Sequence, residues 1–462
     1  MNLILGAGLA GLSASWHLHH HDCVILEKSD VIGGHARSII ADGFTLDHGP
    51  HISFTRHDYV RDLFARNVDD AFHEMPISVA NFYRGSVVEH PAQVHLWQLP
   101  QPLRAACADD MKAAAAARLE SDLCTPRPPD NYLEWLRRSF GRAFADALPA
   151  AYTRKYWTVG PEEMSVDWLG PRMHTPSLAE VEASLVPGSR NKGYYITTGR
   201  YPQTGGFQHF FERFADGAHI RLNSAVAQID LAKKTATIVT GETLPFRRLI
   251  STLPLPDFVR LCSDVPTDVS AAVEQLDCTQ LLLIDVFAPR FSHHDYRWFY
   301  VYDEDKASTR IHCVENMAPA NAPAGMSCVQ VEVYSSRHRP LGEPPESTAV
   351  RVANELVELG FISAADLEKG LVRIATRSCP FANIVFTKPR RSALDTIFRW
   401  LEDHGLSREP DDLDATTDWG ADPASPVGSI VMAGRFAQWK YFWTDDCVLR
   451  GRQIATTSAG RN

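Results

Sequence analysis

A glycine-rich turn close to the start of the chain has the residue types and spacing that bind a pyrophosphate. The turn reads Gly6-Ala7-Gly8-Leu9-Ala10-Gly11 and lies between an apolar stretch at 2–5 and an apolar helix start at 12–16. The first glycine permits a tight turn, the second lets the backbone approach a pyrophosphate, and the third lets helix and strand pack closely. The N–H groups and the positive dipole end of the helix then face the pyrophosphate.

An acidic residue about twenty positions further on completes a dinucleotide-binding pattern. A second predicted strand, Cys23–Leu26, ends directly before Glu27, which is placed to accept hydrogen bonds from a ribose. The glycine string alone is a weak signal, because loops are often rich in glycine. The order strand, glycine turn, helix, strand and acid is far more specific, so we predict a dinucleotide-binding domain at this end of the chain.

The residues that follow Glu27 distinguish FAD from NAD. Gly33-Gly34 and Arg37 resemble the paired glycines and the arginine of glutathione-reductase-like and amine-oxidase-like flavoproteins. In those proteins the paired glycines let the backbone pass close to the cofactor. An ordinary loop with a solvated arginine is the alternative, and we predict FAD.

Length and composition limit the fold and the partners. A chain of 462 residues is too long for one core and predicts two or three domains. Its net charge of -10 argues against a nucleic-acid partner. Nine scattered cysteines without a C-x-x-C spacing indicate neither a disulfide framework nor a zinc site. The histidines between positions 17 and 21 fit a solvated helix end better than a metal site.

The sequence shows no targeting or membrane segment. The first predicted strand begins at residue 2, and no apolar run reaches the length of a membrane span. We therefore expect no signal peptide, no membrane contact and a cytoplasmic location. The sequence does not indicate an oligomeric state.

The order of the predicted elements indicates an α/β protein with three parts. The strand patterns Leu281–Phe287, Trp298–Tyr302 and Cys328–Tyr334 predict a mainly antiparallel sheet over a pocket. The stretch before residue 189 is mostly helical in pattern. We predict a Rossmann-like FAD-binding domain, a helical insert and a mainly antiparallel β-sheet domain for the substrate. Their predicted boundaries are 1–75, 190–260 and 415–462 for the first, 92–189 for the second, and 76–91 and 261–414 for the third.

The last part of the chain is predicted to close the FAD-binding domain. Ile430–Arg435 has the pattern of a final buried strand, and a helix that begins in Asp445-Asp446 follows it. In an FAD protein such a helix usually points its N-terminus at the flavin ring, where its dipole favours an anionic reduced flavin. A plain amphipathic closing helix is the alternative.

Three further strings have residue patterns that occur together in one enzyme family. They are Asp47–Phe54, Glu89–Gln93 and Gly434–Tyr441. They resemble the D-x-G-G-H-x-I-F, Y-P-x-Q and G-R-[YF]-x-x-W-K-Y motifs of the UDP-galactopyranose mutases, particularly of the longer, eukaryotic-type branch. The last string is the most specific of the three, and the resemblance extends loosely over nearly the whole chain.

The resemblance implies a set of site residues. The implied catalytic residues are His51, Arg310 and Arg435. The implied substrate-binding residues are Gln93, Trp157, Arg172, Tyr300, Arg310, Arg435 and Tyr441. The predicted cofactor-binding residues, from the dinucleotide pattern and the resemblance together, are Gly6, Gly8, Ala10, Gly11, Glu27, Lys28, Gly34, His35, Arg37, Gly49, His51, Val226, Gly434, Arg435, Asp445 and Asp446. No metal ligand is predicted.

The resemblance also implies a reaction. In that family the nitrogen N5 of reduced flavin attacks the anomeric carbon of the sugar and displaces UDP. The adduct opens and recloses through a different hydroxyl, which interconverts the pyranose and furanose forms before UDP returns. The implied partners are FAD in its reduced form, NAD(P)H as a candidate reductant, and a UDP-sugar substrate.

The chain departs from the family pattern at several positions. Pro50 replaces a glycine before His51, and His90 stands where the family usually has tyrosine. Asn383 occupies the place of a tyrosine that contacts the diphosphate, and Asp445-Asp446 replaces an Asn-Gln pair near the flavin. The residues that would contact the nucleotide match the family motifs better than those that would contact the sugar. A different sugar, or a different reaction on a nucleotide sugar, therefore stays open.

Two arginines are suited to a diphosphate by their own chemistry. Arg310 and Arg435 are isolated positive charges within apolar, aromatic sequence, and arginine recognises phosphate through two parallel hydrogen bonds. For each of the two, the alternative interpretation is an ordinary surface arginine. This alternative has more weight for Arg310 than for Arg435. Two other function classes also remain. One is an amine-oxidase-like oxidase, dehydrogenase or desaturase acting on a small molecule, and the other is a non-catalytic flavoprotein that senses a nucleotide sugar.

Overall fold

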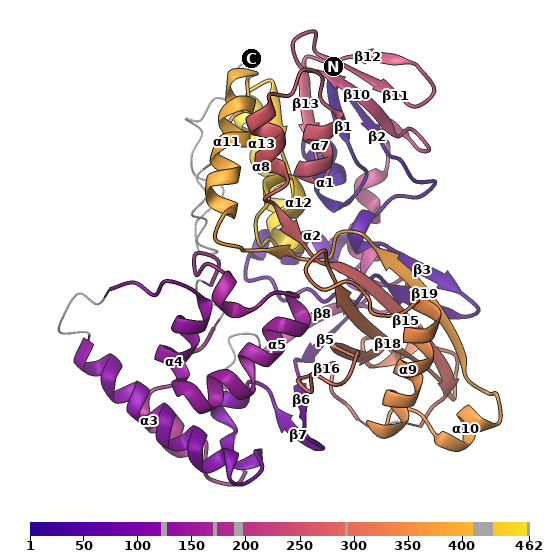
Figure 1. Ribbon diagram of the computed structural model, residues 1–462. Coiled ribbons are helices and arrows are strands. Elements are labelled where there is room, and N and C mark those ends of the chain that lie inside the picture. Colours follow the sequence, from indigo (N-terminus) through magenta and orange to yellow (C-terminus); the bar gives the residue numbers. More distant parts are fainter. Residues whose placement is uncertain (122–126, 170–172, 189–196, 292–293, 410–427, 460–462) are drawn as a thin grey trace.

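The protein combines a parallel sheet, a larger antiparallel sheet and a group of helices (Figure 1). The computed structural model describes residues 1–121, 127–169, 173–188, 197–291, 294–409 and 428–459. Both ends of the chain lie beside the parallel sheet. The predicted α/β class with parallel and antiparallel sheets is confirmed. No helix in the described part of the chain is long and apolar enough to cross a membrane.

The parallel sheet forms the frame of the predicted cofactor domain. Its strands, in spatial order, are β21 (Ile430–Met432), β13 (Arg248–Ser251), β1 (Asn2–Leu5), β2 (Cys23–Leu26) and β9 (Ile220–Arg221). Every neighbouring pair is parallel, and β1, β2 and β21 are buried along their whole length. Since all strands run the same way, the turns that follow β1, β2, β13 and β21 meet at one edge of the sheet.

The first and last helices pack against each other beside this sheet. They are α1 (Leu9–His17) and α13 (Thr444–Ala459). Gly451 permits the close approach, because a Cβ at this position would lie 2.6 Å from the backbone carbon of Ser13. This packing carries the N-terminus of α13 to the edge where the glycine turn lies, and its orientation toward a flavin ring stays a prediction.

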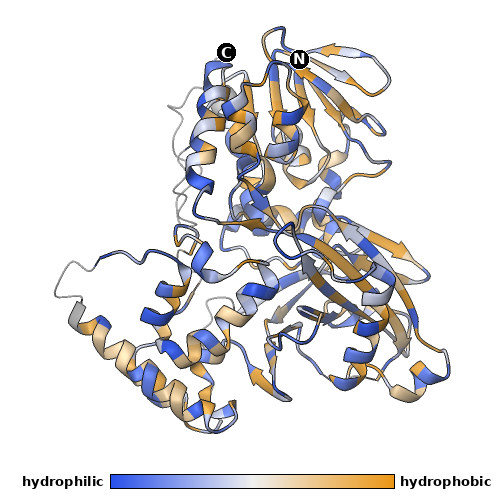
Figure 2. Cartoon of the chain, viewed as in Figure 1, coloured by the Kyte–Doolittle hydropathy of each residue, from blue (hydrophilic) through white to orange (hydrophobic). Residues whose placement is uncertain are grey.

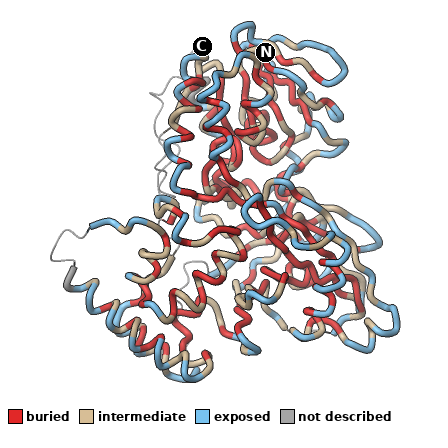
Figure 3. The backbone as a smooth tube through the Cα atoms, viewed as in Figure 1, coloured by how far each residue is buried: buried red, intermediate tan, exposed pale blue. Residues whose placement is uncertain are grey.

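The larger sheet has seven strands. In spatial order they are β19 (Arg373–Cys379), β15 (Gln280–Pro289), β18 (Met326–Ser335), β17 (Arg310–Cys313), β16 (Trp298–Val301), β6 (Val79–Tyr83) and β7 (Ser86–Glu89). Only β16 and β6 pair in parallel; the other pairs are antiparallel. Helix α9 (Pro345–Glu358) covers one face with an apolar cluster. The central strands β15 and β18 are buried over nearly their whole length, while the edge strands β19 and β7 are partly exposed, and Figures 2 and 3 show the hydropathy and the burial of this sheet.

The register of this sheet brings polar side chains into one row. Tyr300 of β16 is opposite Arg310 of β17, and Arg310 is opposite Glu332 of β18. Leu283 of β15 is opposite both Glu332 and Arg377. Residues directly opposite each other in antiparallel strands point to the same face. The row therefore lies on one face, away from α9.

The helical part of the chain is formed by α3 (Leu103–Ser121), α4 (Tyr132–Ala147) and α5 (Pro149–Tyr156). Two short 3-10 turns precede α3, and Pro100 and Pro102 delay its start. Asn131 caps α4, because its side chain accepts a hydrogen bond from the Glu134 N–H.

The remaining elements connect these parts. The strands are β3 (Ser38–Ala41), β4 (Phe44–Asp47), β5 (Phe72–Pro76), β8 (Thr198–Pro202), β10 (Val226–Asp230), β11 (Thr235–Ile238), β12 (Thr243–Pro245), β14 (Asp277–Cys278) and β20 (Ile384–Val385). The helices are α2 (Asp58–Asn67), α6 (Leu178–Ala183), α7 (Leu255–Leu261), α8 (Thr267–Val273), α10 (Ala364–Glu368), α11 (Arg390–Asp403) and α12 (Arg435–Gln438). The division into three domains with the boundaries given above stays a proposal.

Candidate functional site

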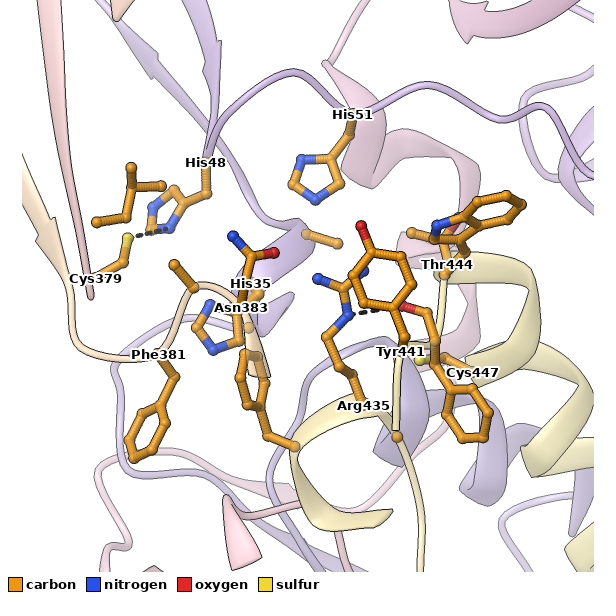
Figure 4. Close-up of a pocket in the computed structure, with 18 of the residues that line it drawn as sticks. His35, His48, His51, Cys379, Phe381, Asn383, Arg435, Tyr441, Thr444 and Cys447 are labelled. Atoms are coloured by element: carbon orange, nitrogen blue, oxygen red, sulfur yellow. Dashed lines mark hydrogen bonds between the residues drawn. The ribbon is translucent and has the colours of Figure 1, made fainter. Parts of the chain in front are cut away.

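One large cavity joins the edge of the parallel sheet to the polar row of the seven-stranded sheet. Its volume is about 870 Å³, and α5 supplies another wall. In Figure 4, His51, Asn383, Arg435 and Tyr441 point toward a common space. The figure also places His48 and Cys379 on one side of that space and Thr444 and Cys447 on the other.

The cavity begins at a backbone cradle that fits FAD. Gly6 adopts a φ of +100°, and Gly34 comes so close to the glycine turn that a Cβ there would lie 2.9 Å from the Gly8 Cα. Gly8 precedes α1 and has no side chain to cap its N–H groups. These groups face the cavity wall, where a pyrophosphate would bind at the positive end of the helix dipole.

Glu27 is fixed at the end of β2 in the position expected of a ribose-binding acid. Its Oε2 accepts a hydrogen bond of 2.8 Å from the Ala7 N–H, and its Oε1 accepts one of 2.9 Å from the Ser29 N–H. The side chain is buried and lines the cavity. Since a carboxylate has more acceptor sites than these two bonds use, Glu27 can still accept from a ribose hydroxyl.

Arg310 is not an isolated charge, and this part of the sequence interpretation is wrong. Its Nε and Nη2 donate to the two carboxylate oxygens of Glu332 at 2.6 and 2.5 Å, and the Tyr334 hydroxyl donates to the same carboxylate at 2.7 Å. Burial alone would lower the pKa of the Arg310 guanidinium, but the Glu332 carboxylate reverses this and holds it above its ordinary value. The sequence alone does not reveal this ion pair, because Glu332 lies on β18, the strand beside β17 in the sheet.

Arg435 has a different electrostatic environment. It follows Gly434 at the carboxyl end of β21, where a φ of +96° at Gly434 turns the chain. Its Nε donates to the Phe442 carbonyl at 2.6 Å, and its guanidinium lies 5.3 Å from the centre of the Tyr441 ring. Among the residues that the structure describes, no carboxylate pairs with Arg435. Its positive charge is therefore available to a ligand.

His51 presents a hydrogen-bond acceptor to the cavity. Its Nδ1 lies 3.1 Å from the carbonyl oxygen of Gly49, which can only accept, so the hydrogen-bond pattern assigns the proton to Nδ1. Burial, followed by the charges of Arg310 and Arg435, lowers the pKa of His51 to about 4. At neutral pH the ring is uncharged, and its Nε2 carries a free lone pair.

Two site residues were missed by the sequence analysis. Glu332 orients Arg310, as described above. Tyr156, on α5, donates from its hydroxyl to the Asn383 Oδ1 at 3.1 Å, and both residues line the cavity. Because the Asn383 Oδ1 accepts the hydrogen bond from Tyr156, the amide N–H groups of Asn383 point away from Tyr156. Tyr156 is hard to recognise in the sequence, since an aromatic residue beside Trp157 is equally typical of a core.

The remaining predicted nucleotide-binding residues line the aromatic end of the cavity. Gln93 donates from Nε2 to the His174 carbonyl at 3.1 Å, which fixes its amide. The Tyr300 ring centre lies 5.2 Å from that of His90. Trp157 also lines the cavity, while Arg172 lies outside the described residues.

Most predicted cofactor residues also line the cavity. They are Gly6, Gly8, Ala10, Glu27, Lys28, Gly34, His35, Arg37, His51, Val226, Gly434 and Arg435. Gly11, Gly49, Asp445 and Asp446 are not part of the cavity wall.

Three of the predicted residues that do not line the cavity pack against or hydrogen-bond to residues next to it. A Cβ on Gly11 would lie 2.0 Å from the Gly6 carbonyl oxygen, so this glycine permits helix–strand packing. Gly49 has a φ of +89° and packs against Glu332. Asp446 accepts from the Trp443 N–H at 2.7 Å at the start of α13.

Comparison with known proteins identifies the family. A family model described as flavin containing amine oxidoreductase matches residues 9–457. The chain belongs to this family. Its membership agrees with the backbone cradle at Gly6 and Gly8 and supports FAD as the cofactor.

Solved structures and a curated relative show how far the similarity extends. The structure of a reduced UDP-galactopyranose mutase matches the whole chain and 96% of that protein, with a TM-score of 0.84 and 22% identity. A putrescine oxidase variant matches the whole chain and 99% of that protein, with a TM-score of 0.60 and 15% identity. These likenesses show the fold. A phytoene dehydrogenase from Streptomyces griseus is 42% identical over 65 residues, which span 14% of this chain and 13% of the dehydrogenase.

No group of three or more His, Cys, Asp or Glu side chains that could hold a metal ion occurs within the described ranges.

Histidines that are buried or line the cavity predict a loss of stability in mild acid. Desolvation is the main cause that lowers the pKa of His51 to about 4 and of His48, His90 and His312 to about 3; His312 is buried and the other three are half-buried. Below pH 6.5 the unfolded chain binds protons at these positions and the folded chain does not. The free energy of unfolding therefore decreases as the pH is lowered. Asp47 acts in the opposite sense, because burial raises its pKa to about 6.

We expect urea unfolding to show a loss of stability between pH 7.5 and pH 5, at up to about 1.4 kcal/mol per pH unit for the buried His312 and less for each of the half-buried rings, which solvent screens. His51→Gln should reduce this pH dependence, and the same substitution at the exposed His21 should not. Equal stability of the native protein at the two pH values would contradict the assignment of neutral rings.

The Arg310–Glu332 pair predicts an asymmetry between the two arginines. Arg310→Ala leaves Glu332 buried and unpaired, which typically costs about 3–5 kcal/mol of stability. Arg435→Ala removes a charge that no described carboxylate needs and should cost much less. Thermal unfolding of both variants checks this, and Arg310→Ala with Glu332→Gln should regain part of the loss. A similar melting temperature for both single variants would show that the pair is not a stabilising unit.

Proposed function

We propose that the protein is a flavin-dependent mutase that interconverts the pyranose and furanose forms of a nucleotide-diphosphate sugar. The observation that carries the proposal is the position of Arg435, an uncompensated guanidinium between the FAD cradle and the aromatic end of the cavity. A ligand that reaches from the flavin to the aromatic residues would place its diphosphate at this charge. The fold similarity to a UDP-galactopyranose mutase supports the same substrate class.

The cavity residues have complementary roles in this proposal. Arg435 and Arg310 bind the diphosphate, and Tyr441 holds the Arg435 guanidinium over its ring. Tyr300 stacks on the base, while Gln93 presents its amide oxygen to the base edge. Trp157 and Trp168 cover the cavity with apolar surface and keep water from the diphosphate.

FAD fits the cradle formed by Gly6, Gly8, Glu27 and Gly34, and when bound in its reduced form it supplies the nucleophile for the anomeric carbon. The chain supplies no side-chain nucleophile in this scheme. His51 holds a neutral Nε2 toward the reacting end and accepts a hydrogen bond there. Reduction would come from NAD(P)H, and the predicted cytoplasmic location would provide it.

An oxidoreductase acting on a small molecule is the second candidate. The family model and the similarity to a putrescine oxidase favour it. This function would use the same cofactor cradle but would not need a positive charge between the cradle and the aromatic residues. The two candidates therefore differ in their dependence on Arg435.

The test compares UDP affinity with flavin content in the same preparations. Trp157, Trp168 and Trp298 line the cavity, so UDP should quench the intrinsic fluorescence. Arg435→Ala should weaken UDP binding about tenfold or more, since a charge-assisted contact contributes about 1.5–3 kcal/mol. Arg435→Lys should recover little, because lysine lacks the planar fork.

Arg260, which is exposed on α7, provides the matched control. Arg260→Ala should bind UDP as the native protein does, and all variants should keep their flavin. If the native protein binds UDP and Arg435→Ala binds it equally well, the diphosphate site is elsewhere. If the native protein does not bind UDP at all, the proposed substrate class is wrong.

A further inference from the structure

The side chain of Lys155 is a buried amine that neither the cofactor cradle nor the diphosphate site uses, and burial lowers its pKa to about 7. It lies on α5 and is 1% exposed. Its Nζ donates to three backbone carbonyls, those of Val301 at 2.8 Å, Asp303 at 2.7 Å and Ser308 at 2.8 Å. An ammonium group has three N–H donors, so all of them are engaged. Such a cage is specific for lysine.

The three carbonyls belong to the connection between β16 and β17, residues 302–309, and to the strand end before it. A second buried ionisable group holds the same connection from the other side. Glu355 of α9 accepts from the Ala307 N–H at 2.8 Å, the Ser308 N–H at 3.0 Å and the Ser308 hydroxyl at 2.6 Å. The Lys155 ammonium donates to carbonyl groups of the connection, and the Glu355 carboxylate accepts from its N–H groups. Between them they satisfy polar backbone that would otherwise be buried without partners.

The strands at the two ends of this connection carry ligand-facing residues. Tyr300 of β16 is paired with Arg310 of β17, and both residues line the cavity. The ladder between β16 and β17 contains two residue pairs, Phe299 with Ile311 and Tyr300 with Arg310, and the Val301 N–H donates to the Thr309 carbonyl beyond them. The outer neighbours β6 and β18 hold the two strands, and the contacts of Lys155 hold the connection between the strands.

Helix α5 therefore contacts the cavity and the connection at once. Tyr152 and Tyr156 of this helix line the cavity, and Lys155 lies between them in the sequence. We propose that Lys155 is a positioning residue that locks the 302–309 connection to α5, so that Tyr300 and Arg310 stay in place for the ligand. For the identity of that ligand the inference rests on the proposed function, whereas the lock itself does not.

Two variants separate this lock from a general effect on the fold. Lys155→Met keeps the apolar stem and removes all three donors. Lys155→Arg keeps the charge, but a planar guanidinium cannot direct its donors at the same three carbonyls. Arg154→Met is the matched control, because Arg154 reaches the same connection from the same helix through an ion pair with Glu304 in which both side chains are more than 40% exposed.

The experiment measures two quantities on the FAD-loaded protein. Amide hydrogen exchange over residues 300–310 should become faster in both Lys155 variants and stay unchanged in Arg154→Met. UDP affinity, from quenching of tryptophan fluorescence, should fall about tenfold in both Lys155 variants, as expected for one weakened charge-assisted contact. Flavin content should match that of the native protein.

Each other outcome overturns the proposal or one of its parts. Unchanged exchange over 300–310 would show that Lys155 does not lock the connection. Faster exchange with unchanged UDP affinity would show that the lock does not position the ligand site. Loss of flavin together with UDP affinity would assign Lys155 a role in the whole fold instead. If the native protein does not bind UDP, the proposed function fails, and the exchange measurement alone decides whether the lock exists.

Discussion

The ion pair between Arg310 and Glu332 is the contact on which the ligand end of the cavity depends. It forms because β17 and β18 pair in a register that places the two residues opposite each other on one face of the seven-stranded sheet. The same register places Tyr300 beside Arg310. A guanidinium held by two parallel bonds has one orientation, so the ion pair and the strand pairing together orient the cationic group beside Tyr300.

The cofactor end depends on a different constraint, the close approach of backbone to backbone. Parallel strands bring the turns after β1, β13 and β21 to one edge, and Gly6 and Gly8 after β1 and Gly434 after β21 leave room for a cofactor. Arg435 follows the last of these turns, which places its charge between the two ends of the cavity. The parallel sheet and the antiparallel sheet thus each supply one arginine. Family membership fixes the class of cofactor, while the ligand follows from what lies between the arginines.

The sequence predicted the cofactor end well because its signals are local. The glycine turn, both flanking strands and Glu27 lie within one short stretch, and each residue has one physical reason for its position. The ligand end was predicted only in part. Arg310 was recognised, but its partner Glu332 is set by strand register, which a single sequence does not reveal. Tyr156 and Lys155 were not recognised as site or positioning residues, since their roles arise from contacts with distant strands.

The most direct test of the account is the conversion of a nucleotide sugar by the reduced protein. FAD-loaded protein is incubated with UDP-galactopyranose, with and without dithionite, and the nucleotide sugars are separated by chromatography. The account predicts that an isomeric UDP-sugar accumulates only after reduction, with no net change in flavin redox state. Turnover of a substrate by the oxidised protein, with hydrogen peroxide formed in equal amount and no isomer from UDP-sugars after reduction, would contradict it.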